Sequence, residues 1–160
     1  MITFKEIQEK DLNILASLYS VALLELKPEE NWTNDTAFSY LSYFYNLQPD
    51  LFICAYDDGI PIGAIFSILK PFWNGLQICD LEVFVSKDYQ GQYIGKNLIQ
   101  NHFALASSKY HVKSVNLIVN QDYLPWFQKI GLEAFYNRIS LSSNIETCLE
   151  NLEQIGKPLI

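Results

Sequence analysis

Two glycines stand where an apolar segment gives way to a helical one, in the stretch VFVSKDYQGQYIGKNLI, residues 83–99. The first N–H groups of a helix lack partners within the helix, and the helix dipole makes that end positive. A loop without bulky side chains lets a phosphate approach these groups. Residues 90–95 could therefore hold a diphosphate, with Lys96 as a counter-charge. An ordinary strand-to-helix connection with two glycines accounts for the same pattern, whose spacing is neither that of a Rossmann motif nor that of a P-loop.

Two carboxylates, Asp80 and Glu82, precede this stretch on the apolar segment LQICDLEVFV, residues 76–85. Because side chains alternate along a strand, the two acids are expected on one face and Leu81 on the other. A carboxylate in a cleft can take a proton from an amine, and a β-bulge could turn either acid toward such a cleft. Glu82 is favoured as the base. The structural alternative is a buried or rim acid paired with a lysine or a backbone donor.

Acidic and aromatic side chains also gather in two expected loops. The segment KPEENW, residues 27–32, supplies Glu29 and Trp32, and the segment PFWNG, residues 71–75, supplies Trp73. Charge attraction and cation–π contact suit these groups to an alkylammonium ion. Solvated loop residues and packing aromatics would give the same composition.

The composition indicates one globular domain, residues 1–160. Of these residues 49% are hydrophobic and 18% are charged, a balance that excludes a disordered chain. The formal charge of −7 disfavours nucleic acids and anionic membranes as partners and is compatible with a cationic substrate. No apolar run approaches the roughly 20 residues of a membrane helix, and Met1 leads straight into a strand. We therefore expect no signal peptide and a cytoplasmic location.

The cysteines and histidines do not form a metal-binding pattern. Cys54, Cys79 and Cys148 are an odd number without metal-type spacing, and His102 and His111 lie apart from one another. We therefore expect no metal site. Two of the thiols, Cys54 and Cys79, are expected to be buried, and Cys79 lacks a partner base that would make it a nucleophile.

The periodicity of apolar residues predicts an alternation of strands and helices. The expected strands are 2–8, 51–57, 60–70, 76–85, 114–120 and 133–142. The expected helices are 12–26 with Asp11 as N-cap, 36–47 capped by Asn34 or Asp35, 94–110, 123–131 closed by Gly131, and a helical tail from residue 144. This order favours a mixed α/β sheet covered by helices.

Three of these segments together resemble the GCN5-related N-acetyltransferase (GNAT) superfamily. Gln90 and Gly95 match the ends of its acetyl-CoA motif, (Arg/Gln)-x-x-Gly-x-(Gly/Ala). The segment 120–135 resembles the downstream motif of the superfamily, and the segment 56–69 resembles its Asp-Gly-x-x-Val-Gly hairpin. The motifs and the expected elements stand in the family's order, so the resemblance covers nearly the whole chain. The spacing around residues 71–73 is similar to that of the diamine and polyamine N-acetyltransferase branch.

The resemblance implies a mostly antiparallel central sheet with helices on both faces. A splayed cleft would open between the strand at 76–85 and its neighbour at 114–120. There the pantetheine arm of acetyl-CoA would pair with the main chain of Val83 and Val85, and loop amides would hold the pyrophosphate. The residues implied in acetyl-CoA binding are Val83, Phe84, Val85, Gln90, Gly91, Gln92, Tyr93, Ile94, Gly95, Lys96, Asn120 and Phe127.

The sequence departs from the family pattern at three positions. Tyr93 replaces the middle glycine of the motif, which is tolerable if its φ is negative and its ring faces solvent or the adenine side. The position where the family often carries a carboxylate is Leu81, so that Glu82 is the implied base. Phe127 replaces the tyrosine that often protonates the departing thiolate, and Tyr123 one turn earlier, or water, would take its role.

The implied activity is direct transfer of an acetyl group from acetyl-CoA to a primary amine, without a covalent enzyme intermediate or a metal. The favoured acceptor is a small amine or polyamine, and a protein or peptide amine is the second choice. Acceptor contacts are expected from Glu29, Trp32, Trp73 and Asp80. A non-catalytic acyl-CoA-binding regulatory module is the alternative, and a homodimer is compatible with either.

Overall fold

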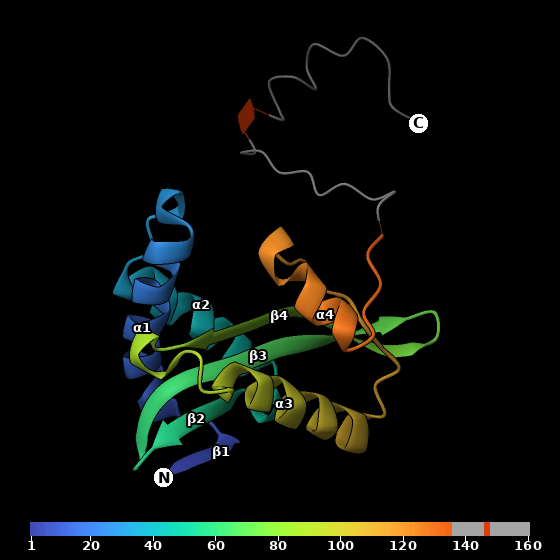
Figure 1. Ribbon diagram of the computed structural model, residues 1–160, viewed down its shortest axis with the longest axis horizontal. Helices are drawn as coiled ribbons and strands as arrows, with labels where there is room; N and C mark the ends of the chain where they lie inside the picture. Colours follow the sequence, from blue (N-terminus) through green and yellow to red (C-terminus); the bar gives the residue numbers. More distant parts are fainter. Residues whose placement is uncertain (136–145, 148–160) are drawn as a thin grey trace. The chain divides into compact units, whose positions relative to one another are not determined.

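The computed structural model describes residues 1–135 and 146–147, and Figure 1 shows their course. The chain forms two compact units, residues 1–118 and residues 119–160. In the described part of the chain, no helix is long and apolar enough to cross a membrane. The same residues contain no cluster of three or more His, Cys, Asp or Glu side chains that could hold a metal ion.

The first unit is built on a five-stranded sheet in which each strand neighbours the next along the chain. The pairings β1–β2, β2–β3 and β3–β4 are antiparallel, and β4–β5 is parallel. The mixed, mostly antiparallel sheet is confirmed. The strands are β1 (Ile2–Glu6), β2 (Ile53–Asp57), β3 (Ile60–Phe72), β4 (Gly75–Val85) and β5 (Ser114–Val115).

Helices cover both faces of this sheet (Figure 1), and alternation along β3 decides which helix each residue meets. Phe66 packs in the core cluster shared with the first two helices. Its neighbour Ser67 faces the third helix, where its hydroxyl lies 3.0 Å from the ring nitrogen Nε2 of His102. The helices are α1 (Leu12–Leu26), α2 (Asn34–Leu47) and α3 (Ile94–Tyr110).

The caps of the first two helices differ in part from the expectation. Asp11 stands at the N-cap of α1, but its carboxylate accepts the hydroxyl of Tyr56 at 2.6 Å rather than a helix amide. Helix α2 is capped by Thr33, whose hydroxyl accepts the N–H of Thr36 at 3.2 Å in a reciprocal capping box. The prediction of Asn34 or Asp35 as cap was therefore wrong by one or two residues, because the side chain that reaches the third helical amide is that of Thr33.

The fifth strand is much shorter than the expected 114–120. Only Ser114 and Val115 pair with β4, opposite Gln77 and Ile78, and the N–H of Asn116 then donates to the carbonyl of Ile78 at 2.9 Å. The apolar residues that follow belong to the same apolar segment of the sequence, but they do not pair with β4 as a strand. As a result the C-terminal half of β4 is not covered by β5.

The second unit contains the 3-10 turn η5 (Gln121–Tyr123) and the short helix α4 (Leu124–Lys129). Gly131, with a φ of 96°, closes α4 by donating its N–H to Gln128 at 3.0 Å, as expected. Residues 133–135 of the predicted last strand have no regular structure. The rest of that strand, Cys148 and most of the predicted helical tail lie outside the described residues, and residues 146 and 147 are helical.

Asp50 joins the end of α3 to the turn before β2. It lies in the 3-10 turn η3 (Pro49–Leu51) and accepts Lys109 Nζ at 2.7 Å, the hydroxyl of Tyr110, and Gln48 Nε2 at 3.0 Å. Burial alone would raise the pKa of Asp50, but these donors outweigh burial and lower the pKa to about 2. The ionised carboxylate is thus the form that the folded protein favours.

We expect Asp50→Asn to lower the free energy of unfolding by about 1–2 kcal/mol at neutral pH. Because the folded-state pKa lies below the unfolded value, the contribution of Asp50 is present above about pH 4 and is lost as the pH falls toward 2. Urea unfolding across this range should show a steeper loss in the unsubstituted protein than in Asp50→Asn. Glu9→Gln, at an exposed residue, is the matched control and should keep the steep loss. Equal slopes for the unsubstituted protein and Asp50→Asn would contradict the assignment.

Candidate functional site

A one-residue bulge interrupts β4 at Asp80. On β3, Phe66 and Ile68 are two residues apart, but their partners on β4, Glu82 and Cys79, are three apart. Asp80 takes up the extra residue with a φ of 50°, in the left-handed region. Because a shift of one residue exchanges the faces of a strand, Glu82 is turned to the face opposite the one that unbroken alternation would give. Asp80 itself pairs with Lys70 of β3 and acts on Tyr40, and the expectation that Asp80 and Glu82 share a face stays a prediction.

The bulge brings Glu82 against two tyrosines of the covering helices. The hydroxyl of Tyr19 in α1 donates to Glu82 Oε2 at 3.2 Å, and the hydroxyl of Tyr40 in α2 donates to Oε1 at 3.3 Å. Burial raises the pKa of Glu82, against the effect of the two phenols and Lys27, while Glu30 adds to the increase. A half-buried carboxylate of raised pKa is a stronger base than a free one and is suited to accept a proton.

Aromatic rings surround this carboxylate and open onto a cavity. The ring of Trp32 lies 5.3 Å from that of Tyr19 and 5.2 Å from that of Tyr40, centroid to centroid. Trp32 is itself held by its indole N–H, which donates to Glu30 Oε2 at 2.6 Å. A cavity of about 440 Å³ lies beside them. Its lining residues are Trp32, Asp35, Thr36, Ser39 and Tyr40.

Beyond the bulge, one edge of β4 carries main-chain groups directed away from β3. Ser86 donates its N–H to the carbonyl of Ile62 across β3 at 2.8 Å. Since backbone groups of successive residues point to opposite edges of a strand, the N–H and C=O groups of Val83 and Val85 face the other edge. The pairing of β4 with β5 ends at Ile78 and does not reach these two valines. Gln90 Nε2 donates to the carbonyl of Val85 at 3.0 Å, which joins the glycine loop to this edge.

Phe84, between these two valines, is turned the other way. It lies opposite Ala64 in the β3 ladder, and its ring is buried in the core formed with α1 and α2. The packing of Phe84 in the core therefore fixes the position of this part of β4. The backbone groups of Phe84 itself face β3.

The glycine loop leads into α3 with two residues in the left-handed conformation. Gly91 has a φ of 76° and Tyr93, the N-cap of α3, a φ of 62°. The condition under which Tyr93 was expected to be tolerable, a negative φ, is therefore not met, because the helix begins at Ile94 and the chain reverses at its N-cap. The ring is 75% exposed, so it lies in solvent and blocks no amide, but its Cβ carries the strain of a left-handed backbone.

Gly95, in the first turn of α3, has no steric reason within the first unit to be glycine. A Cβ built on it would meet only Val85 Cγ2, at the ordinary contact distance of 3.9 Å. Glycine in a helix lowers its stability by roughly 0.5–1 kcal/mol relative to alanine. An empty space over the first helical amides, kept at that cost, fits a loop that a phosphate approaches.

The other loop residues have separate roles. Ile94 is buried under the helix start, whereas Lys96 is exposed. Gln92 Nε2 donates to the carbonyl of Asp88 at 3.2 Å and closes the loop on itself. Lys96 is thus the residue of this group whose charge is available above the N-terminus of α3.

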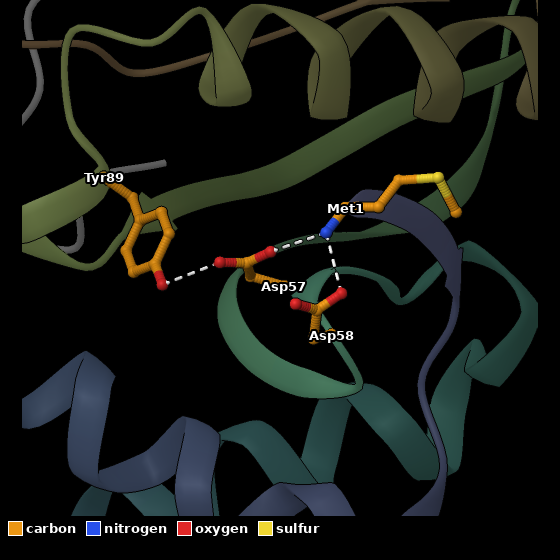
Figure 2. A network of polar contacts seen from close by, with 4 residues as sticks. All are labelled: Met1, Asp57, Asp58 and Tyr89. Carbon is orange, nitrogen blue, oxygen red and sulfur yellow. Dashed lines mark hydrogen bonds and ion pairs between the residues drawn. The ribbon is translucent and has the colours of Figure 1, made fainter.

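A polar network holds the turn that precedes the glycine loop (Figure 2). The hydroxyl of Tyr89, the last residue of the 3-10 turn η4 (Lys87–Tyr89), donates to Asp57 Oδ2 at 3.0 Å. The other oxygen of Asp57 accepts the amino group of Met1 at 3.1 Å, and Asp58 accepts it at 2.7 Å. The β2–β3 turn therefore fixes the segment from which the glycine loop starts.

The four residues predicted to bind the acceptor are not brought together. Trp32 lines the cavity. Asp80 forms an exposed ion pair, its Oδ2 lying 2.8 Å from Lys70 Nζ. Trp73 is 85% exposed at the β3–β4 turn, and Glu29 is exposed in the 3-10 turn η2 (Pro28–Glu30).

The remaining predicted residues belong to the second unit. Asn120 is the N-cap of η5 and accepts the N–H of Tyr123 at 3.0 Å through its main-chain carbonyl. Phe127 lies in α4 with its ring 5.0 Å from that of Trp126. Their expected contacts with acetyl-CoA and with the leaving thiolate stay predictions.

Two residues of the site, Tyr19 and Tyr40, were not singled out from the sequence as functional. Tyr19 shares the helical spacing of the apolar residues of α1, which is typical of a residue that faces the core, and it is 1% exposed. This spacing does not show that the two hydroxyls meet one carboxylate that lies 63 and 42 residues further along the chain. No short motif connects positions so far apart.

Comparison with known protein families finds a family model that matches part of this chain. The family model described as Acetyltransferase (GNAT) domain matches residues 48–138. No curated protein matches the sequence.

Solved structures are similar in fold at low identity. A "predicted acetyltransferase with acetyl-CoA" from Clostridium acetobutylicum has a TM-score of 0.64 at 14% identity, over 89% of this chain and 96% of that chain. Ribosomal-protein-alanine N-acetyltransferase from Brucella melitensis biovar Abortus 2308 has 0.65 at 18%, over 89% and 99%. Glucosamine-6-phosphate N-acetyltransferase from Arabidopsis thaliana has 0.64 at 13%, over 91% and 99%.

We expect Tyr93→Gly to raise the free energy of unfolding above that of Tyr93→Ala by about 1 kcal/mol, because only glycine relieves the left-handed N-cap. Both substitutions remove the exposed ring, so their difference isolates the Cβ atom. Urea titration of the two variants measures this difference. Equal stability would show that the backbone at residue 93 is not strained.

Proposed function

This chain belongs to the acetyltransferase (GNAT) family, and on that premise we propose that it transfers the acetyl group of acetyl-CoA to a small primary amine. The observation that supports the amine most directly is the half-buried carboxylate of Glu82, which has a raised pKa and lies next to an aromatic cavity. A diamine or polyamine is the favoured acceptor.

Acetyl-CoA fits the residues at the end of β4 and the start of α3. The main-chain groups of Val83 and the N–H of Val85, on the edge of β4 that faces away from β3, can pair with the amide groups of the pantetheine arm. The loop amides before α3, the uncovered Gly95 and the exposed Lys96 suit the pyrophosphate. With the phosphates at the loop, the arm runs back along β4 toward the bulge, and the thioester comes to lie near Glu82.

Glu82 acts as the general base in this proposal. An aliphatic ammonium group has a pKa near 10.4 and must lose a proton before its nitrogen can attack the thioester. Glu82 accepts that proton, the N–C bond forms as the C–S bond breaks, and a backbone N–H near Val85 stabilises the negative charge that develops on the carbonyl oxygen. The thiol has a pKa near 8.5, so it leaves as thiolate and takes a proton from water.

The cavity supports a cationic acceptor. The faces of Trp32 and Tyr40 attract a cation through their ring electrons, and Asp35 adds a negative charge at the same cavity. Glu29 then acts at a distance, as an exposed carboxylate that attracts a cation. The uncharged Trp73, and Asp80 in its ion pair with Lys70, add little to this long-range attraction. A protein or peptide amine would offer the same ammonium group on a larger body and is the second choice.

A non-catalytic acyl-CoA-binding module is the competing function, favoured by Phe127 in place of the usual tyrosine. The two functions differ in one measurable product. An enzyme releases free CoA thiol from acetyl-CoA when an amine is added, whereas a binding module takes up acetyl-CoA without release.

We expect Gly95→Ala to weaken acetyl-CoA binding at least tenfold while leaving the free energy of unfolding unchanged or raising it by up to about 1 kcal/mol. The Cβ meets no close neighbour within the first unit, so the loss would come from the ligand. Calorimetric titration and urea unfolding of the same variant separate the two effects. An unchanged affinity for acetyl-CoA would contradict the proposal that this loop binds the pyrophosphate.

We expect Glu82→Gln to lower kcat/KM for the best amine by about 10²- to 10⁴-fold, because a general base contributes on that order. Affinity for acetyl-CoA, measured by calorimetry, should stay within threefold. Asp80→Asn, which removes the exposed acid paired with Lys70, should cause a loss at least tenfold smaller. A larger loss for Asp80→Asn than for Glu82→Gln would transfer the role of base to Asp80.

A further inference from the structure

We propose that the hydroxyl of Tyr40 relays the proton from the acceptor amine to Glu82. Glu82 would then receive the proton without touching the amine. This inference rests on the proposed function, since the proton that Tyr40 carries comes from the amine to be acetylated.

Tyr40 is the residue that belongs both to the cavity and to the carboxylate. It lines the cavity together with Trp32 and Asp35, and its hydroxyl donates to Glu82 Oε1 at 3.3 Å. Tyr19 donates to the other oxygen, but it is 1% exposed and does not line the cavity. The two phenols are therefore alike as hydrogen-bond donors to Glu82 and differ in access to the cavity.

The hydroxyl of Tyr40 has the groups that a relay needs. A phenol donates one hydrogen bond and accepts up to two, so Tyr40 can donate to Glu82 while it accepts an N–H of an ammonium ion. An N–H bond then breaks as an O–H bond forms on Tyr40, and the original O–H bond of Tyr40 breaks as one forms on Glu82. The amine nitrogen keeps its electron pair, Tyr40 ends neutral, and Glu82 ends as the carboxylic acid.

The electrostatic surroundings favour transfer of both protons together. Burial and the neighbouring carboxylate raise the pKa of Tyr40, so a free phenolate is disfavoured and the hydroxyl does not store the charge. The other titratable groups that act on Glu82 are Tyr19 and Lys27 of the α1 region and Glu30 of η2, and Asp80 acts on Tyr40. None of these lines the cavity.

The relay also narrows the class of acceptor. A group that lies against Asp35 and the rings of Trp32 and Tyr40 is favoured when it is cationic, and its N–H must reach the phenol. An unbranched primary alkylammonium ion meets these conditions. An acceptor that carries a carboxylate or phosphate beside its amine would be repelled by Asp35 and by Glu82.

The test compares Tyr40→Phe with Tyr19→Phe, using spermidine, 1,3-diaminopropane and a lysine-containing peptide as acceptors. Each variant removes one phenol from Glu82 and no carbon atom, so each should move the acid limb of the kcat/KM profile to higher pH, because a hydrogen bond to the ionised carboxylate is lost. At the plateau above this limb, Tyr40→Phe should lower kcat/KM at least tenfold more than Tyr19→Phe. Calorimetric affinity for acetyl-CoA should be equal in both variants.

Each possible result of this comparison either supports or overturns the relay through Tyr40. Equal plateau losses, with shifted acid limbs in both variants, would overturn the relay while leaving Glu82 as base and the acetyltransferase intact. A greater loss for Tyr19→Phe would overturn it as well. If the unsubstituted protein binds acetyl-CoA but releases no thiol with any of the amines, the proposed function fails and the relay fails with it.

Discussion

The one-residue bulge at Asp80 is the constraint on which the rest of the site depends. Without it, Glu82 would lie on the face of the sheet that α3 covers, away from Tyr19 and Tyr40. With it, the acid lies under the aromatic rings of α1 and α2. A left-handed backbone at a non-glycine residue is unfavourable by roughly 1–2 kcal/mol, and the long β3–β4 ladder on either side supplies the pairing that maintains it.

The two halves of β4 differ in their strand pairing because β5 is short. Near Gln77 and Ile78 the strand pairs with a neighbouring strand on both edges, whereas near Val83 and Val85 its strand partner in the described part of the chain is β3. A strand with one unpaired edge inside a rigid sheet is a preformed partner for an extended ligand. The same edge ends at Gln90, whose side chain binds the carbonyl of Val85. Edge and loop therefore form one continuous surface on the first unit of the chain.

The acceptor side is less determined by fold than the acetyl-CoA side. The similar structures include N-acetyltransferases named for a ribosomal-protein alanine and for glucosamine 6-phosphate, so one backbone serves unlike acceptors. What distinguishes this chain is local: Trp32, Asp35 and Tyr40 around one cavity, and Glu82 held by two phenols. In the proposed function these groups select a small cation, and they come from α1, α2 and the turn between them rather than from the acetyl-CoA edge.

The sequence by itself determined the element order and the glycine loop before α3, because periodicity and turn residues act between near neighbours. The mostly antiparallel sheet was implied by the resemblance to the GNAT superfamily. The sequence also singled out Glu82 and allowed for a bulge, but alternation cannot show at which residue a strand gains one. The short β5, the positive φ of Tyr93 and the pairing of Glu82 with Tyr19 and Tyr40 were decided only by tertiary structure. Each depends on contacts between segments far apart in the chain, and no local pattern of residue types specifies those contacts.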